Sequence, residues 1–318
     1  MRKESAPIWD RSNQERIGAQ KVQTMIESYY QLNTPISLAL VSDLHGRPYE
    51  RVIESLRRNA PEAICVCGDF IYGRFPEDGI SPLSAQTYVL PFIKACADTA
   101  KTFVSLGNHE WMLDAADLGE IEKTGAKVLD NDWTEWNGIV IGGLTSAGVD
   151  DYRRFREESY RSADKSSYLG QDKLGGADAP NLTCPRWEVP SGERYPRREI
   201  THRTYENLRP ETEWIDQMPT GYKVLMSHHP EYWDYVKDKG IDLMLSGHTH
   251  NGQIAYYSVT KHRWTGLWAP GQGWFPKYSS GVYEDGKLVV SAGLSNTVAI
   301  PRLFNPTQVI YIQSHACY

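Results

Sequence analysis

The stretch PISLALVSDLH, residues 35–45, establishes the pattern that the chain then repeats. It is a continuous apolar, β-favouring run closed by polar residues, as expected of a strand buried on both faces. Similar runs follow at 62–69 (EAICVCGD) and 101–108 (KTFVSLGN), and helical stretches at about 50–59 and 83–97 separate the three runs. This alternation of strands and helices predicts an α/β fold.

The second half of the chain continues the pattern, with a short helix predicted at 231–240. An Asp285-Gly286 pair between two alternating runs indicates a β-hairpin. Before the first strand, residues 15–31 place apolar side chains near helical spacing and predict a helix. The further predicted strands are 126–132, 137–143, 222–227, 241–246 and 308–314.

The composition restricts the classes of partner. Hydrophobic residues make up 40% of the 318 residues, which excludes a wholly disordered chain. The 34 Lys and Arg are outnumbered by 40 Asp and Glu, giving a net charge of −6. Non-specific nucleic-acid binding depends on basic residues that neutralise phosphates, so nucleic acid is an unfavoured partner. A small phosphorylated substrate stays compatible, because bound metal can outweigh local side-chain charge.

No stretch has the roughly 20 apolar residues that a membrane span needs, and the N-terminus lacks the apolar core of a signal peptide. Five cysteines imply no disulfide framework, so the expected location is the cytoplasm. Cys65 and Cys67 could form a metal pair, but their apolar surroundings favour packing in a buried strand. Peripheral contact with a membrane stays open, and no feature predicts an oligomeric state.

The stretch at about 150–209 is polar, charged and aromatic, with few long apolar runs. We interpret it as a polar insertion or lid within one domain that spans residues 1–318, because it has too little apolar content for a core of its own. Its basic cluster could bind a substrate phosphate, but such runs are more often solvated. The cluster consists of Arg194, Arg197, Arg198 and Arg203.

Polar side chains of the kind that bind metals follow five predicted strands. In α/β sheets, ligands gather at the carboxyl ends of the strands. Two pairs have i,i+2 spacing, which in extended backbone directs both side chains to one side. Mixed imidazole and carboxylate ligands suit Zn, Fe or Mn better than Ca. The residues are Asp43 and His45, Asp69, Asn108 and His109, His228, and His248 and His250.

These motifs occur in a recognisable order: DLH (43–45), GD (68–69), GNHE (107–110), HHP (228–230) and GHTH (247–250). As an ordered set they resemble the calcineurin-like metallophosphoesterase superfamily. The extension GHTHNGQ and a C-terminal segment ending in IPRLFNP resemble its bacterial YkuE/YaeI-like branch. The resemblance covers about residues 36–131 and 222–312. It implies a four-layer α/β/β/α sandwich with two metal ions at the edge of the sheets.

The resemblance also assigns roles to the matched residues. Asp69 would bridge the two ions, and His109 would lie beside the leaving group as a general acid. Asn108 and His109 would contact the substrate, whereas His229 would be a neighbour of the site. Glu110, which stands where the family often has Asp, would orient or tune the site. The implied ligands are Asp43, His45 and His250 for the first ion, and Asn108, His228 and His248 for the second.

The expected activity is hydrolysis of a phosphodiester or phosphomonoester by attack of metal-bound hydroxide, with Mn, Fe or Zn as the two divalent or trivalent ions. One alternative is a nuclease of the same superfamily, which the acidic charge disfavours. A second is a non-catalytic interaction protein on the same fold. Such a protein should have lost metal-ligating residues, whereas every matched motif is intact in this sequence.

A third alternative is a lipid pyrophosphatase at the membrane surface, which would need an exposed aromatic loop. The segment at 264–275 (WTGLWAPGQGWF) could provide an apolar rim for such a substrate. Packing of this loop over the sheet is the favoured interpretation, because exposed aromatic patches are uncommon.

Overall fold

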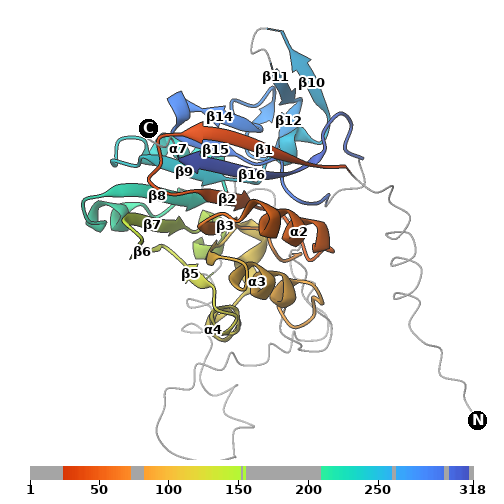
Figure 1. Ribbon diagram of the computed structural model, residues 1–318. Coiled ribbons are helices and arrows are strands. Elements are labelled where there is room, and N and C mark those ends of the chain that lie inside the picture. The colour runs from red at the N-terminus through yellow and green to blue at the C-terminus, as the bar shows by residue number, and fades with distance from the viewer. Residues whose placement is uncertain are drawn as a thin grey trace, which may run out of the picture.

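The computed structural model describes residues 24–72, 82–151, 153–154, 209–259, 263–296 and 301–314. Within them, two six-stranded sheets lie face to face, with helices on the outer side of the first sheet (Figure 1). The mixed α/β class predicted from the sequence is confirmed. Nearly all of the predicted insertion and its four arginines lie outside the described residues.

The first sheet has the strand order β1-β16-β2-β3-β4-β5. Strands β2 to β5 run parallel, and β16 is antiparallel to β2 but parallel to β1. The strands are β1 Met25–Leu32, β2 Leu38–Val41, β3 Ala63–Cys67, β4 Lys101–Ser105, β5 Lys127–Leu129 and β16 Thr307–Ser314.

The second sheet has the order β14-β15-β9-β8-β7-β6, with β7, β8, β9 and β15 parallel. Its outer pairs, β6 with β7 and β14 with β15, are antiparallel. The β14–β15 pair confirms the predicted hairpin at Asp285-Gly286, where both residues have positive φ. The strands are β6 Asp132–Trp136, β7 Ile139–Leu144, β8 Tyr222–Ser227, β9 Leu243–Ser246, β14 Gly281–Tyr283 and β15 Leu288–Val290.

The side chains of β2 alternate between two cores. Leu38 and Leu40 pack between the sheets, whereas Ala39 and Val41 face the helices. Those helices are α2 Glu50–Asn59, α3 Val89–Ala97 and α4 Ala115–Lys123. The outer face of the second sheet packs, within the described residues, against short helical segments such as η3 Glu213–Gln217 and α7 Trp233–Val236. The complete fourth layer of the sandwich stays a prediction.

Cys65 and Cys67 belong to the core between the sheets and are free thiols. Burial raises the pKa of Cys65 to about 12. The packing interpretation of this pair is therefore confirmed.

The helix predicted at 15–31 is wrong where the structure describes it, because Met25–Leu32 forms strand β1. This strand pairs in parallel along its whole length with β16, from the other end of the chain. Its exposure alternates roughly along the strand, as on a half-covered sheet edge. Tertiary pairing with a distant strand outweighed the local helical spacing.

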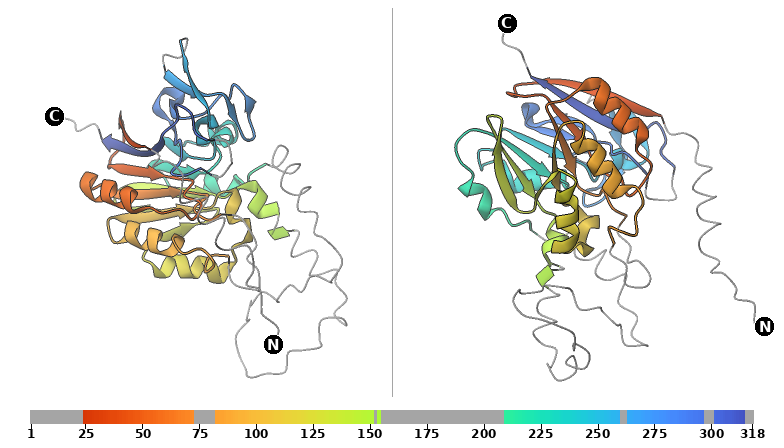
Figure 2. Two further views of the ribbon diagram at one scale, coloured as in Figure 1. Left: turned by 90° about the vertical axis from the view of Figure 1, so that its right-hand side faces the viewer. Right: turned by 60° about the horizontal axis from the view of Figure 1, so that its bottom comes forward.

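Beyond the second sheet, a small extension contains β10 Ala255–Ser258, β11 Arg263–Gly266, β12 Trp268–Ala269 and β13 Gly273–Trp274, and its hairpin projects from the body (Figure 2). Trp268 is 44% exposed, Trp274 68% and Phe275 67%. The prediction that the aromatic loop packs over the sheet is therefore wrong for these three side chains. The loop instead forms an exposed apolar surface.

Candidate metal centre

The predicted ligands gather where five strands end. Asp43 and His45 follow β2, Asp69 follows β3 and Asn108 follows β4, while His228 follows β8 in the second sheet. His248 and His250 follow β9, next to β8. Face-to-face packing brings the carboxyl ends of the central strands of both sheets to one edge. Residues separated by more than 200 positions therefore meet: His250 Nε2 lies 3.4 Å from Asp43 Oδ1.

Both i,i+2 pairs reach the site through left-handed backbone, which corrects the extended geometry predicted for them. The φ angles are 57° at Asp43 and 49° at His45, and 68° at His248 and 47° at His250. Asp69 also has a positive φ of 52°. Such conformations are strained for residues other than glycine and concentrate at functional sites. The pairs converge because a tight turn follows each strand.

Among the described residues, four groups of side chains could each hold a metal ion, and two of these groups match the ligand sets predicted for the two ions. Asp43, His45 and His250 place one ligand atom each within 4.8 Å of one another, and Asp69, His228 and His248 do the same. Asp69 Oδ2 lies 3.0 Å from His228 Nε2 and 3.9 Å from His45 Nε2, so it faces both groups. Its position fits the bridging role predicted for it.

The residues present fit metal ions, as their unpartnered atoms show. Both ring nitrogens of His45 and Oδ1 of Asn108 are buried without a hydrogen-bond partner. A buried polar atom left unpaired costs free energy that a coordinated cation would offset. The outer nitrogens of two ligands are held: His228 Nδ1 lies 2.8 Å from the Cys67 carbonyl, and His250 Nδ1 3.2 Å from the Ser295 carbonyl. These contacts direct Nε2 into the site.

The protonation states also suit a cation site. Burial lowers the pKa of His45 and His248 well below the usual range, with neighbouring histidines adding to the shift. Burial likewise lowers the pKa of His250 to about 4. These imidazoles are therefore neutral near pH 7, the form that binds metal.

In the metal-free protein, His228 behaves differently from these three imidazoles. Although burial opposes it, the Asp69 and Asp43 carboxylates raise the pKa of His228 to about 10. The centre thus attracts positive charge, which a metal ion would supply in place of that proton.

Glu110 holds the loops that carry Asp69 and Asn108. It is fully buried, and its carboxylate accepts hydrogen bonds from the backbone N–H groups of Asp69 (2.8 Å), Gly107 (2.7 Å) and Ile71 (3.1 Å). Burial and the Asp69 charge raise its pKa to about 8. This geometry is consistent with the orienting role predicted for Glu110.

His109 lies at the accessible side of the cluster. Its backbone N–H donates to Asp69 Oδ1 at 2.9 Å, and its Nε2 lies 3.8 Å from Asp69 Oδ2. The side chain is 28% exposed, whereas those of His45 and His228 are fully buried. A group that donates a proton to a leaving oxygen needs this combination of proximity and access.

His229 belongs to neither of the two groups, but it forms a further group with Glu231 and His248 that could hold a metal ion. Its Nε2 lies 2.9 Å from Ser146 Oγ and its Nδ1 3.1 Å from Glu231 Oε1. Its ring contacts that of His248 at a centroid distance of 4.2 Å. Sequence reasoning missed both contacts: Ser146 follows β7, a different strand from the β8 that precedes His229, whereas Glu231 lies only two residues after His229.

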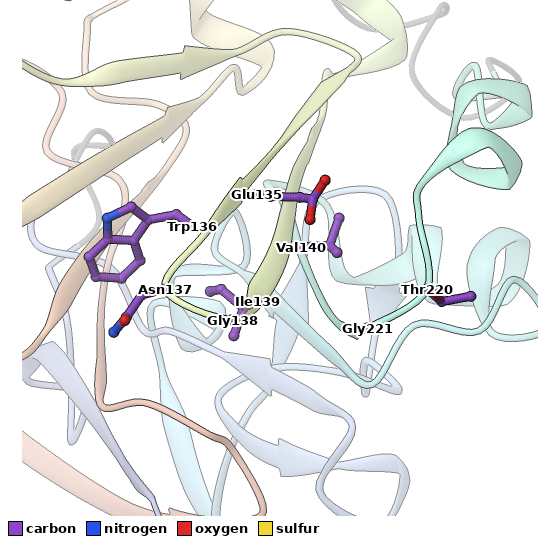
Figure 3. Close-up of a pocket in the computed structure, with 8 residues that line it drawn as sticks. All are labelled: Glu135, Trp136, Asn137, Gly138, Ile139, Val140, Thr220 and Gly221. Atoms are coloured by element: carbon purple, nitrogen blue, oxygen red, sulfur yellow. The ribbon is translucent and has the colours of Figure 1, made fainter.

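A pocket of about 220 Å³ lies elsewhere, lined by the β6–β7 turn and by Thr220 and Gly221 (Figure 3). Ile139 pairs with Tyr222 at the start of β7 and β8, whereas His228 follows the end of β8. The pocket is therefore at the opposite end of the strands from the candidate ligands.

A model of the calcineurin-like phosphoesterases matches residues 36–252 of the chain, which includes every motif from Asp43 to His250. The chain belongs to the calcineurin-like phosphoesterase family. The superfamily resemblance is thereby confirmed, and the finer assignment to the YkuE/YaeI-like branch stays a prediction.

Among curated proteins, the uncharacterized protein YpbG of Bacillus subtilis (strain 168) is 24% identical over 231 residues. The match covers 70% of this chain and 64% of YpbG, so it spans less than two thirds of that relative.

Among solved structures, a cold-active protein-tyrosine phosphatase of a psychrophile, Shewanella sp., matches at 11% identity with a TM-score of 0.34. It covers 90% of this chain and 77% of the phosphatase. A mutant of a cold-active protein tyrosine phosphatase matches at 13% identity with a TM-score of 0.28, covering 70% and 67%. Within the described residues, no helix has the length and apolar character needed to cross a membrane.

Proposed function

We propose that the protein is a dinuclear metal-dependent phosphoesterase that hydrolyses a phosphodiester or phosphomonoester of a small molecule. The observation that carries the proposal is the pair of adjoining ligand groups, Asp43–His45–His250 and Asp69–His228–His248. Asn108 Oδ1, which is buried without a hydrogen-bond partner, would complete the second group. Mn, Fe and Zn are the ions that this mixture of imidazole and carboxylate favours.

Bound metal ions would lower the pKa of a water molecule and stabilise charge on the phosphoryl oxygens. The chain's own residues position the ligand groups, orient the substrate and transfer the proton. Asp69 holds the two groups at a fixed separation, because its carboxylate faces both. Asn108 orients the substrate phosphate beside them. His109 delivers a proton to the leaving oxygen, which its partial exposure allows.

The test is hydrolysis of bis-p-nitrophenyl phosphate by chelator-treated protein with added Mn²⁺, alongside Asp69→Asn. Asp69→Asn replaces one carboxylate oxygen with an amide of the same shape and removes the shared charge. We expect metal-dependent activity in the wild type and its loss in the variant, with two metal ions per chain in the wild type alone. Elemental analysis that found two ions bound to the variant would disprove the bridging role.

A second candidate substrate class is a phosphorylated lipid at a membrane surface, including a lipid pyrophosphate. The observation that favours it is the exposure of Trp268, Trp274 and Phe275, with Phe304 74% exposed beside the same extension. Aromatic side chains of this kind insert at the boundary between headgroups and acyl chains.

Flotation with neutral and anionic phospholipid vesicles tests this candidate. We expect the wild type to float with vesicles and the variant Trp274→Ser/Phe275→Ser to stay in the dense fraction. Tyr88→Ser, which changes an exposed aromatic residue at the start of α3, is the matched control. Absence of wild-type binding to both kinds of vesicle would leave the lipid candidate without support.

A further inference from the structure

A second set of buried unpartnered atoms lies beside the metal centre and is not explained by metal ions. It comprises Oδ1 of Asn251, Oε1 of Gln253, Oδ1 of Asn305, and Nε and Nη1 of Arg302. Asn251 is 6% exposed and Asn305 3%. Buried polar groups in native proteins are almost always paired, so such a concentration indicates a missing partner.

These residues come from two segments that the phosphoesterase assignment leaves without a role: NGQ (251–253), which follows the ligand motif GHTH, and IPRLFNP (300–306). The two segments are joined by the backbone: Leu303 N–H donates to the Gln253 carbonyl at 3.0 Å. The side chain of Asn305 donates to the His250 carbonyl at 2.6 Å. The four residues therefore form one polar cluster, not scattered defects.

Arg302 supplies a positive charge that has no carboxylate partner at hydrogen-bonding distance. Its Nη2 donates to the Ser295 carbonyl at 2.6 Å and lies 3.0 Å from His250 Nδ1. Among the described residues, it forms no salt bridge. The guanidinium of arginine stays protonated at neutral pH. The charge of the Asp43 carboxylate favours the protonated guanidinium, but the two groups form no salt bridge. A buried guanidinium without a carboxylate in contact with it is costly unless an anion binds there.

The position of Arg302 separates it from the reacting phosphate. His250 directs Nε2 towards Asp43 (3.4 Å) and Nδ1 towards Arg302 (3.0 Å), so the imidazole ring lies between the guanidinium and the metal centre. Any group that Arg302 binds is therefore displaced from the scissile bond by about the width of that ring.

The backbone beneath the cluster is also held in an unfavourable conformation. His250, Asn251 and Gln253 have φ angles of 47°, 46° and 56°. Three such residues within four positions are costly and are typical of a site whose geometry is fixed for binding.

We propose that Asn251, Gln253, Arg302 and Asn305 form a polar subsite that binds a second oxyanion of the substrate, such as a second phosphate, beside the metal centre. Arg302 supplies charged N–H donors for the oxyanion. The amide oxygens accept hydrogen bonds from hydroxyl groups next to it. The proposal rests on the proposed phosphoesterase function and narrows its substrates to hydroxyl-bearing molecules with an anionic group besides the scissile phosphate.

The test counts inorganic phosphate ions bound per chain by equilibrium dialysis, with and without bound Mn²⁺. We expect two in the metal-loaded wild type and one after removal of the metal. Arg302→Gln should bind one when loaded and none when stripped, with an affinity at the subsite at least tenfold lower. Arg302→Lys, which keeps the charge, should retain part of that affinity. Arg58→Gln, which changes an exposed arginine on α2, is the control.

The outcomes separate the two proposals. If removal of the metal leaves the number of bound phosphate ions unchanged, but Arg302→Gln binds one phosphate fewer than the wild type, the subsite stands and the phosphoesterase proposal fails. If stripped Arg302→Gln binds phosphate as the stripped wild type does, the subsite is overturned. Should Arg302→Gln fail to fold, Gln253→Glu places a negative charge in the same cluster. It should abolish metal-independent phosphate binding while metal content stays at two ions, and undiminished binding would overturn the proposal.

Discussion

At the scale of single residues, the candidate ligands combine two unfavourable features. Asp43, His45 and Asp69 are buried polar groups, and each also has a left-handed backbone. Each strained residue costs on the order of 1–3 kcal/mol, which the surrounding structure must offset. The sequence allowed the ligand types to be predicted from their places after apolar runs. It could not reveal the backbone, because nothing local in SDLHG or SGHTH requires positive φ outside the glycines.

His109→Ala tests the division between metal binding and proton transfer. Loss of a general acid typically lowers kcat by about 10²–10⁴-fold. Because the His109 side chain is partly exposed at the edge of the cluster, we expect the variant to retain both metal ions. Elemental analysis and kcat measured on the same preparation provide the check. Loss of a metal ion would make His109 a ligand.

Asp150 provides a pH-dependent prediction away from the metal centre. Burial raises its pKa to about 6, against about 3.9 in an unfolded chain. The folded state therefore binds the proton more tightly, and the contribution of Asp150 to the free energy of unfolding falls as pH rises from about 4 to about 6.

Accordingly, Asp150→Asn should be more stable than the wild type near pH 7, by on the order of 1–3 kcal/mol. The difference should vanish below about pH 4, where the wild-type carboxyl is protonated. Urea unfolding across this range measures it, with Asp216→Asn as an exposed control. A difference that does not change with pH would contradict the assignment.

At the scale of elements, the turns after the strands determine the positions of the candidate ligands more than the strands themselves do. Gly107 follows β4, and a Cβ at this position would lie 2.3 Å from Asp69 Oδ1 and 2.9 Å from His228 Cγ. Only glycine allows the loop that bears Asn108 to approach the other two ligands this closely.

Gly107→Ala should therefore displace Asp69 or His228 and weaken metal binding at least tenfold, with a matching loss of activity. Gly119→Ala is the matched control: it lies in α4, and its added Cβ would meet nothing within 4 Å. The control should keep both ions and gain about 0.5–1 kcal/mol of stability. Calorimetric titration with Mn²⁺ compares the two, and equal affinities would contradict the steric argument.

Elements whose neighbours are close in sequence were predictable. The strand at 38–41, the helix at 50–59 and the hairpin at Asp285-Gly286 follow from apolar runs and turn residues. The segment at 25–32 was not, because its identity as a strand depends on β16 about 280 positions away. The proposed Arg302 subsite was not predictable for the same reason, because it depends on contacts between loops that are distant in the sequence.

At the scale of the whole molecule, the two sheets depend on a strand from the end of the described chain. β16 lies between β1 and β2, and its Ile310 and Ile312 contribute to the core between the sheets. The order of strands in a sheet is a property of packing and leaves no periodic signal in the sequence, so this arrangement could not be predicted.

Ile310→Ala should lower the free energy of unfolding by about 2–5 kcal/mol, because it removes a fully buried side chain from this core. Gln313→Ala, an exposed change in the same strand, should alter it by less than about 0.5 kcal/mol. Guanidinium unfolding of both variants measures the difference. Equal effects would mean that β16 contributes mainly through its backbone pairing.

The place of β16 also determines when the protein can fold as it is synthesised. A ribosome that has just added residue 300 has made every candidate ligand, but β1 and β2 still lack the strand that joins them. Until residues 307–314 leave the exit tunnel, β2 presents an unpaired apolar edge to its surroundings. The nascent chain is therefore exposed to aggregation at this edge until β16 has been made, although the candidate ligands are all made earlier.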